Sequence, residues 1–237
     1  MGLFKDFTMD KLQPREFRYE RKFLVDDLHT YQVRNLVKRH PGMFYEPFPP
    51  RYVNNLYLDT EDMQHYHENV NGVGERHKVR IRWYGDLWGD ISYPVLEFKI
   101  KSGLVGTKYS YPFIAFRMDN RFSHNYFQKL IQEADLPVLV KQYLRELNAI
   151  LCNRFYRWYY TTRGKQFRVT VDTEMAYYRV KKMGNRFLEK FVDWEHVVLE
   201  LKYAKPLEFQ AGKIAGFFPF SVTRNSKYVT GIDRVLG

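Results

Sequence analysis

The chain has 237 residues, of which 45% are apolar, so it can bury a core and is not a disordered tail. Its 38 Lys and Arg against 27 Asp and Glu give a formal charge of +11, which favours an anionic partner: nucleic acid, a membrane surface or a polyphosphorylated small molecule. Cys152 is the only cysteine, which excludes an intrachain disulfide framework and a cysteine-rich zinc site and suits a reducing compartment.

Neither a signal peptide nor a membrane span is expected from the apolar segments. The stretch from Met1 to Lys11 lacks a continuous apolar core, and no run of about 18 apolar residues occurs in the sequence. We therefore expect a cytoplasmic protein without a membrane span, for which any membrane contact comes from a separate partner.

Alternation of apolar and polar residues dominates the sequence, and 19 Tyr and 19 Phe favour strands. In chain order, strands are expected over 16–25, 51–58, 75–84, 92–101, 107–117, 154–162, 166–173, 176–182, 186–192 and 195–204. Short turns that contain Gly or Asn make successive strands antiparallel neighbours. Helices are expected over 26–39 with Asp26 or Asp27 as the cap, 60–68, 123–134 after Ser123, 137–150, and 206–216 with Pro206 in the first turn. Without repeats or long linkers, the sequence predicts a single α+β domain over residues 1–237.

Charged residues occupy alternate positions in several of these strands, and such positions point to the same face of a sheet. In one strand Lys78, Arg80 and Arg82 share a face, while Val79 and Ile81 between them are apolar. The same pattern recurs in four other strands, with the charged sets Arg18, Glu20 and Lys22; Glu97, Lys99 and Lys101; Arg168 and Asp172; and Glu200 and Lys202. At least five strands therefore carry a face of mixed charge.

Two arrangements account for these charged faces. One is a half-solvated sheet whose charged face lies in water. The other is a sheet that curls into a closed barrel with its helices outside, in which case the charged faces line the interior. So much Arg and Lys in an interior requires an anion, and a chain of phosphates fits because Arg forks and Lys ammonium groups bind phosphate oxygens. The interleaved carboxylates would then bind Mg²⁺ or Mn²⁺ together with phosphate oxygens.

Short motifs occur along the chain in this order: RYERKF at 18–23, NLYLD at 55–59, KVRIRWYG at 78–85, LEFK at 96–99, RWYY at 157–160, RVTVDT at 168–173, LELK at 199–202 and SKYVTG at 226–231. Through these motifs the chain resembles, from about Phe17 to Gly231, the VTC domain within the wider triphosphate tunnel family that includes the CYTH enzymes. Each motif alone is weak, but the ordered set is fairly specific.

The resemblance implies an antiparallel tunnel of about eight strands in which basic residues hold the triphosphate of ATP and the γ-phosphoryl group passes to a growing polyphosphate. The positions that match the phosphate-binding residues of the family are Lys22, Arg80, Arg82, Lys99, Arg157, Lys227 and, with less regular spacing, Lys108. Glu200 matches the metal-binding glutamate. Arg18 stands where the CYTH signature Glu-x-Glu-x-Lys has its first glutamate, so a VTC-type metal site is expected, in which Glu20 assists Glu200.

We therefore expect a metal-dependent phosphotransferase of the polyphosphate polymerase type, which uses Mn²⁺ or Mg²⁺ and acts on ATP, inorganic triphosphate or polyphosphate. Arg18, Arg168 and Lys202 share faces with these residues and are further candidates for substrate binding. A triphosphatase of the same fold and a non-catalytic polyphosphate-binding module stay open as alternatives. Glutamates within the charged faces oppose nucleic-acid phosphates, so no specific nucleic-acid partner is expected.

Overall fold

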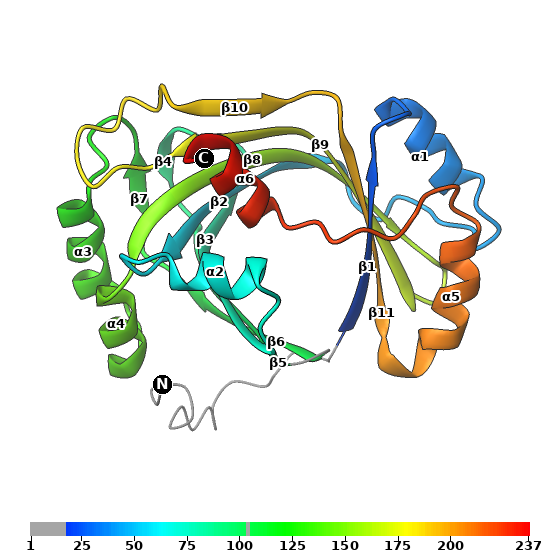
Figure 1. The fold of residues 1–237 in the computed structure, drawn as a ribbon, viewed down its shortest axis with the longest axis horizontal. Coiled ribbons are helices and arrows are strands. Elements are labelled where there is room, and N and C mark those ends of the chain that lie inside the picture. Colours follow the sequence, from blue (N-terminus) through cyan, green and yellow to red (C-terminus); the bar gives the residue numbers. More distant parts are fainter. Residues whose placement is uncertain (1–17, 103–104) are drawn as a thin grey trace.

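The structure is a computed structural model that describes residues 18–102 and 105–237 (Figure 1). Its strands are β1 (Arg18–Val25), β2 (Arg51–Asp59), β3 (Glu75–Tyr84), β4 (Gly89–Ile91), β5 (Val95–Ser102), β6 (Val105–Pro112), β7 (Phe116–Met118), β8 (Asn148–Thr161), β9 (Phe167–Arg179), β10 (Lys190–Asp193) and β11 (Val197–Ala204). Its helices are α1 (Thr30–Lys38), α2 (Gln64–Val70), α3 (His124–Glu133), α4 (Val138–Arg145), the 3₁₀ helix η1 (Lys205–Leu207), α5 (Glu208–Gly216) and α6 (Lys227–Val235). Within the described residues, no helix combines the length and the apolar content that crossing a bilayer requires.

One antiparallel sheet dominates the molecule. Its strand order is β1-β11-β9-β8-β2-β3-β5-β6, and β10 pairs with the far part of β9, beyond the segment that pairs with β11. β4 and β7 form a separate two-stranded pair. In Figure 1 the large sheet curls around a central space, so its concave face looks inward. This confirms the predicted antiparallel α+β architecture.

The barrel is not fully closed, which corrects the prediction of a closed tunnel. The edge strands β1 and β6 have Cα atoms within 8 Å of each other, yet no backbone ladder joins them in the described part of the chain. A side-chain contact spans this seam instead, since Nζ of Lys99 on β5 lies 3.5 Å from Oε2 of Glu20 on β1. Closure depends on strand tilt and stagger around the whole sheet, which alternation within single strands does not determine.

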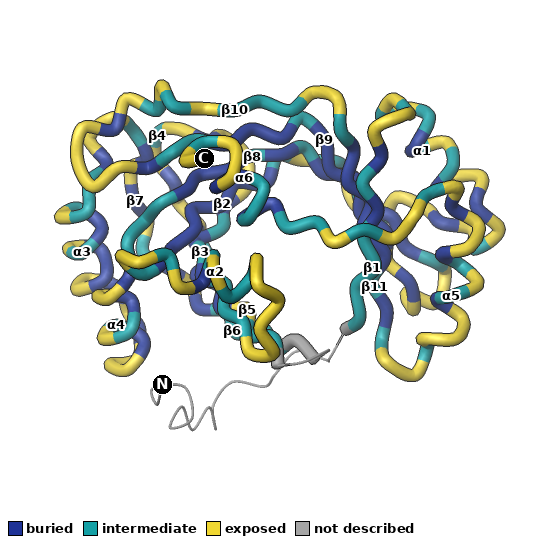
Figure 2. Tube along the Cα trace, in the orientation of Figure 1, coloured by how far each residue is buried: buried dark blue, intermediate teal, exposed yellow. Residues whose placement is uncertain are grey.

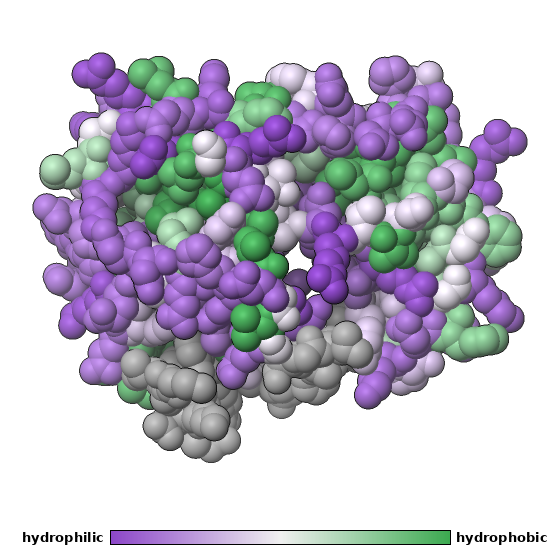
Figure 3. Space-filling model, in the orientation of Figure 1, coloured by the Kyte–Doolittle hydropathy of each residue, from purple (hydrophilic) through white to green (hydrophobic). Residues whose placement is uncertain are grey.

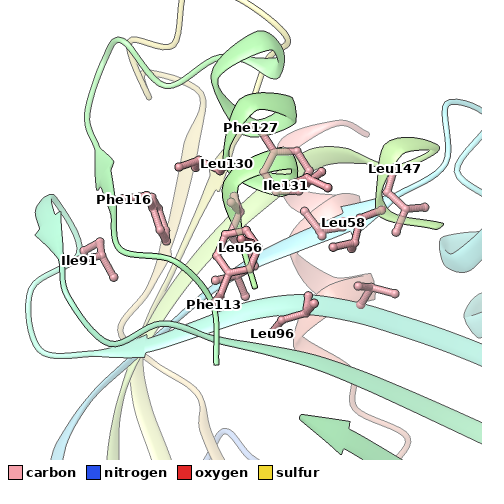
Figure 4. Packing of buried hydrophobic residues seen from close by; sticks show 14 of the residues in the cluster. Leu56, Leu58, Ile91, Leu96, Phe113, Phe116, Phe127, Leu130, Ile131 and Leu147 are labelled. Carbon is pink, nitrogen blue, oxygen red and sulfur yellow. The ribbon is translucent and has the colours of Figure 1, made fainter. Parts of the chain in front are cut away.

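Two hydrophobic clusters pack helices against the convex face of the sheet. One lies beneath α3 and α4 and joins Phe127 and Leu144 of those helices to Leu56 and Leu96 of the strands (Figure 4). The other lies beneath α1 and α5 on the opposite side of Figure 1. In Figure 2 the strands between these clusters contain many buried residues, drawn in dark blue. They are buried because every second side chain of a strand is apolar and points toward the helices. Helices on the outside therefore leave the inward face to the polar and charged residues.

α6 is the exception, because it packs on the inward side of the sheet. Its Tyr228 and Ile232 form a third hydrophobic cluster with Tyr57 of β2, Leu151 of β8 and Tyr177 of β9. In Figure 1 the chain crosses the front of the barrel from α5 to reach it. α6 thus covers the part of the barrel where β2 ends and β8 begins.

The carboxylate of Asp59, at the end of β2, ties α2 and α6 to the sheet. Its Oδ1 accepts hydrogen bonds from the backbone N–H groups of Thr60 and His65, both at 2.8 Å. Its Oδ2 accepts from the backbone N–H of Tyr66 at 2.9 Å and from the hydroxyl of Tyr228. One fully buried carboxylate therefore satisfies the start of α2 and anchors α6.

Several strand boundaries differ from those expected. The strand expected at 186–192 is β10, which begins only at Lys190. Residues 148–150, expected at the end of a helix, belong to β8 because Asn148 and Ala149 pair with Asp59 and Leu58 of β2. The strands expected at 166–173 and 176–182 are one strand, β9, with a register shift that places Glu174 at φ 52°. The strand expected at 107–117 is broken into β6 and β7.

The helices also differ at several places. The helix expected at 60–68 is α2, which begins at Gln64, and the one expected at 206–216 is divided into η1 and α5. α6 was not expected, since its sequence contains Val, Thr and Gly, which are weak helix formers. α1 begins at Thr30 after His29 instead of after Asp26 or Asp27, because the Gln32 side chain accepts a hydrogen bond from the backbone N–H of His29. The cap expected at Ser123 is confirmed, since its side chain accepts from the backbone N–H of Tyr126.

The close packing of α6 predicts a stability effect at Gly231. A Cβ atom there would lie 2.6 Å from Cδ2 of Leu151 and 2.6 Å from Cδ1 of Tyr177, and both side chains are buried. We expect Gly231→Ala to lower the free energy of unfolding by about 1–3 kcal/mol, measured by urea denaturation. Gly216→Ala is the matched control, since no atom lies within 4 Å of its added Cβ. Equal stability of both variants would contradict the described packing of α6.

Candidate functional site

The inward face of the sheet surrounds a cavity of about 100 Å³. Its walls come from six strands and from the start of α6. The lining residues are Glu20, Lys22, Tyr57, Lys78, Arg80, Arg82, Lys99, Phe155, Arg157, Glu200, Lys202, Ser226, Lys227 and Tyr228. Eight of these side chains are Lys or Arg and two are carboxylates, so positive charge is in excess. In Figure 3 a hollow lies near the middle of the molecule, with strongly hydrophilic residues along one side of it.

Strand alternation explains how these side chains come together. On β3, Lys78, Arg80 and Arg82 line the cavity, while Val79 and Ile81 between them belong to the hydrophobic cluster beneath α3 and α4. The structure therefore favours the charged interior over the half-solvated sheet.

Asp172 is a buried carboxylate behind the cavity wall, and it holds two of the cations in place. Its Oδ1 and Oδ2 accept from Nε and Nη2 of Arg157 at 2.5 and 2.6 Å, and its Oδ2 lies 2.6 Å from Nζ of Lys227. Burial tends to raise the pKa of Asp172, but Arg157 and Lys227 outweigh it and lower the pKa. The ionised carboxylate thus links β8, β9 and α6 at the cavity.

Glu97 has the same role on the other half of the sheet. Its Oε2 lies 2.6 Å from Nη2 of Arg80 and 3.8 Å from Nη1 of Arg82, and its Oε1 contacts Nζ of Lys108. These three cations lower the pKa of Glu97 despite its burial. For Lys108, burial outweighs Glu97 and lowers the pKa to about 8. The Arg80 guanidinium is therefore fixed by a carboxylate that does not line the cavity.

Glu20 and Glu200 are the carboxylates that face the cavity itself. Nζ of Lys22 lies between them, 3.0 Å from Oε1 of Glu20 and 3.5 Å from Oε1 of Glu200. Oε2 of Glu200 also lies 2.7 Å from Nζ of Lys202 and 3.5 Å from Nη2 of Arg157. Burial raises the pKa of Glu200, but the surrounding Lys and Arg side chains lower it well below the usual value. Both groups are ionised at neutral pH, since cations likewise lower the pKa of Glu20.

The lowered pKa values of the remaining lysines indicate that the positive charge in the cavity exceeds the negative charge of its carboxylates. Burial and the charges of Lys22 and Lys99 lower the pKa of Lys78 well below its usual value, and its Nζ donates to Oγ of Ser226 at 2.8 Å. Glu20 raises the pKa of Lys99, but burial together with Lys22 and Lys202 lowers it overall. Crowded ammonium groups of this kind are stabilised when an anion enters the cavity.

Most of the predicted site residues meet in this cavity. Those that line it are Lys22, Arg80, Arg82, Lys99, Arg157, Lys202, Lys227, Glu20 and Glu200. Lys108 lies behind the wall on Glu97, and Arg168 is exposed on β9 outside the lining. Arg18 begins β1, but its side chain lies outside the described residues. The chemical roles of all these residues stay predictions.

Several residues that line the cavity were not predicted from the sequence. Lys78 carried the alternation signal but matched no assigned position of the family. Ser226 and Tyr228 could not be placed without α6, which brings them to the cavity. Asp172 was recognised as part of a charged face, but its place behind Arg157 follows only from the pairing of β8 with β9.

The carboxylates that line the cavity suit a hard divalent ion that completes its coordination shell with oxygens of a bound substrate. In residues 18–102 and 105–237, no group of three or more His, Cys, Asp and Glu side chains has an arrangement that could hold a metal ion by itself. The ionised carboxylates of Glu20 and Glu200 are nevertheless oxygen donors on one cavity wall. Mg²⁺ and similar ions bind through one or two carboxylates together with water and substrate phosphate oxygens. These two residues therefore fit the predicted Mn²⁺ or Mg²⁺, on condition that a phosphate-bearing substrate shares the ion.

Comparison with solved structures shows a shared fold. A putative adenylate cyclase of Bacillus halodurans has a TM-score of 0.52 at 15% identity, covering 94% of this chain and 98% of that chain. A putative adenylyl cyclase of Hippeastrum, described as having a dominant triphosphatase activity, also has a TM-score of 0.52 at 15% identity, covering 92% of this chain and 95% of that chain.

Sequence comparison gives the family. Subunit 2 of the vacuolar transporter chaperone complex of Saccharomyces cerevisiae is 24% identical over 208 residues, a match that covers 76% of this chain and 25% of that protein. The chain thus spans about a quarter of the length of this curated relative. The VTC domain family matches residues 17–236, nearly the whole sequence. This match confirms the resemblance found in the sequence motifs, and the chain belongs to the VTC domain family.

Proposed function

We propose that the protein is a phosphotransferase of the polyphosphate polymerase type, which acts on ATP or inorganic triphosphate with bound Mn²⁺ or Mg²⁺ and extends polyphosphate. The observation that carries this proposal is the excess of eight Lys and Arg side chains over two carboxylates around one small cavity. A linear chain of phosphates supplies negative charge along its whole length, so it neutralises cations on every wall.

The three arginines suit phosphate binding because their guanidinium groups are already oriented. Arg157 is held by Asp172 and Arg80 by Glu97, while Nε of Arg82 donates to Oδ1 of Asn55 at 2.8 Å. The remaining N–H groups of each fork are available to phosphate oxygens. Fixed donors bind a charged group without the cost of ordering long side chains on binding.

Phosphoryl transfer in such a site works through positioning and electrostatics, with little covalent chemistry from the protein. Arg80, Arg82 and Arg157 would neutralise the negative charge that develops on the transferred group. Glu20 and Glu200 would hold the divalent ion, which when bound would supply positive charge next to the phosphates. Lys22, in contact with both carboxylates, would hold the substrate beside them.

Hydrolysis of triphosphate is the second candidate, and the activity described for the Hippeastrum protein of the same fold favours it. The same side chains would bind the substrate in either case. The two functions differ in the acceptor, which is water in a hydrolase and the end of a phosphate chain in a polymerase. Product analysis therefore separates them.

Arg82→Ala tests phosphate binding with little expected loss of stability. Burial and the nearby Arg80 lower the pKa of Arg82, so its removal relieves crowding, and Glu97 keeps Arg80 at 2.6 Å. Because a hydrogen bond to a charged group is worth about 1.5–3 kcal/mol, the Kd for tripolyphosphate should rise roughly tenfold or more in isothermal titration calorimetry. Arg117→Ala removes the same charge from an exposed position and is the control. Equal loss of affinity in both variants would show that only net charge matters.

Glu200→Gln tests whether the site catalyses a reaction. The change keeps the shape of the side chain but removes the charge that suits a divalent ion. After incubation with ATP and Mn²⁺, the parent should give long polyphosphate on electrophoretic separation from orthophosphate. The variant should form product roughly a thousandfold more slowly, because loss of a metal that stabilises the transferred group costs several kcal/mol.

Glu189→Gln, which lies outside the cavity and pairs with Arg179 and Lys181, is the matched control and should retain the parent rate. Orthophosphate as the sole product of the parent would favour the triphosphatase. A Glu200→Gln variant with the parent rate and the parent Mn²⁺ dependence would show that Glu200 holds no catalytic metal. No product from the parent, with tripolyphosphate still bound, would favour a binding module.

A further inference from the structure

A cluster of aromatic rings around Arg51 lies at one end of the barrel. The guanidinium carbon of Arg51 lies 3.9 Å from the ring centroid of Tyr84 and 5.3 Å from that of Tyr159. Nε of Arg51 donates to the Tyr159 hydroxyl at 3.3 Å, and Phe48 meets the Tyr159 ring edge-on at 6.2 Å between centroids. We call Phe48, Arg51, Tyr84 and Tyr159 the aromatic rim.

The aromatic rim continues the inward face of the strands that carry the phosphate-binding candidates. Tyr84 lies two residues beyond Arg82 on β3, and Tyr159 lies two residues beyond Arg157 on β8. Arg51 on β2 is the ladder partner of Arg157. Residues two apart share a face and are separated by about 6.6 Å along a strand. The two tyrosines of the rim therefore lie one inward-facing position beyond the two arginines on the same strands.

Along this face, cationic side chains at one end are followed by aromatic side chains at the other end. Along β3 the inward positions are Arg76, Lys78, Arg80, Arg82 and then Tyr84. Arg76 is paired in the ladder with Lys101, so cations continue away from the rim. α6 packs at that far side too, where it contacts the beginning of β8 and the end of β2. A ligand with several phosphates at one end and a flat, uncharged group at the other matches this order.

The side chains of the rim are available to such a group. Tyr84 is 46% exposed, Phe48 is 61% exposed and Arg51 is also exposed. Exposed aromatic rings at an inward-facing position gain from stacking with a nucleobase, and every base has a flat face for this contact. A guanidinium stacked on a ring extends the same platform. Inorganic polyphosphate has no flat ring that could stack on the tyrosines of the rim.

We propose that Arg51, Tyr84 and Tyr159 form a subsite for the base of a nucleoside triphosphate whose phosphates reach Arg82 and Arg157. This inference rests on the proposed function and deepens it, because it makes a nucleoside triphosphate, and not inorganic triphosphate, the ligand that uses the whole site. The base lies at the rim, and the terminal phosphate points toward Lys78 and α6.

Calorimetric titration with ATP and with inorganic tripolyphosphate separates the two parts of the site. In a Tyr84→Ala/Tyr159→Ala double variant, the Kd for ATP should rise roughly fivefold to a hundredfold, the range expected for lost stacking of a base. The Kd for tripolyphosphate should stay within about twofold of the parent, which also shows that the cavity is folded. A Tyr84→Phe/Tyr159→Phe variant should retain ATP affinity, because its rings still stack.

Tyr93→Ala is the control, since Tyr93 is 89% exposed and lies outside the rim, and it should change neither Kd. An unchanged ATP Kd in the double alanine variant, or an equal loss for both ligands, would overturn the base subsite while leaving the phosphate site in place. A parent protein that does not bind tripolyphosphate would overturn the proposed function on which the subsite rests.

Discussion

The arrangement of the site depends on one fully buried carboxylate, Asp172 of β9. It pairs with Arg157 of β8 through two hydrogen bonds and with Lys227 of α6 at 2.6 Å. Removal of one member of a buried ion pair leaves a charge without a partner and costs about 3–5 kcal/mol. The same contact therefore fixes where α6 meets the sheet and how the Arg157 guanidinium faces the cavity. Glu97 repeats this arrangement on β5, where it orients Arg80.

The charge of the cavity also bears on how the barrel is held together. β1 and β6 approach each other without a ladder in the described residues, and the contact between Lys99 and Glu20 spans the seam. Glu20 in turn shares Lys22 with Glu200, one of the two carboxylates that suit a metal ion. Side chains that would bind substrate and metal are thus the ones that join the two edges of the sheet. A VTC domain with this geometry combines arginines held by carboxylates with a seam that is bridged by an ion pair.

Much of this could be predicted from the sequence, because strand alternation is a local property. It placed Lys78, Arg80 and Arg82 on one face, and these side chains line the cavity. Properties that depend on distant contacts could not be predicted in this way. α6 forms from weak helix formers because Asp59 and Asp172 hold its Tyr228 and Lys227.

Other features also could not be predicted from local sequence patterns. Arg168 has the correct alternation but is exposed near the start of β9, a strand that contributes no side chain to the cavity lining. The seam depends on the tilt of all the strands. Which of the two ions binds, and whether water or a phosphate chain accepts the phosphoryl group, depend on the bound complex, so neither follows from a pattern of side chains.

A crystal structure of the protein with tripolyphosphate and Mn²⁺ tests the central claim most directly. The account predicts phosphate oxygens within hydrogen-bond distance of Arg80, Arg82 and Arg157, with anomalous scattering from Mn²⁺ beside Glu200. Tripolyphosphate bound outside the cavity, with these arginines still turned to their carboxylates alone, would contradict it.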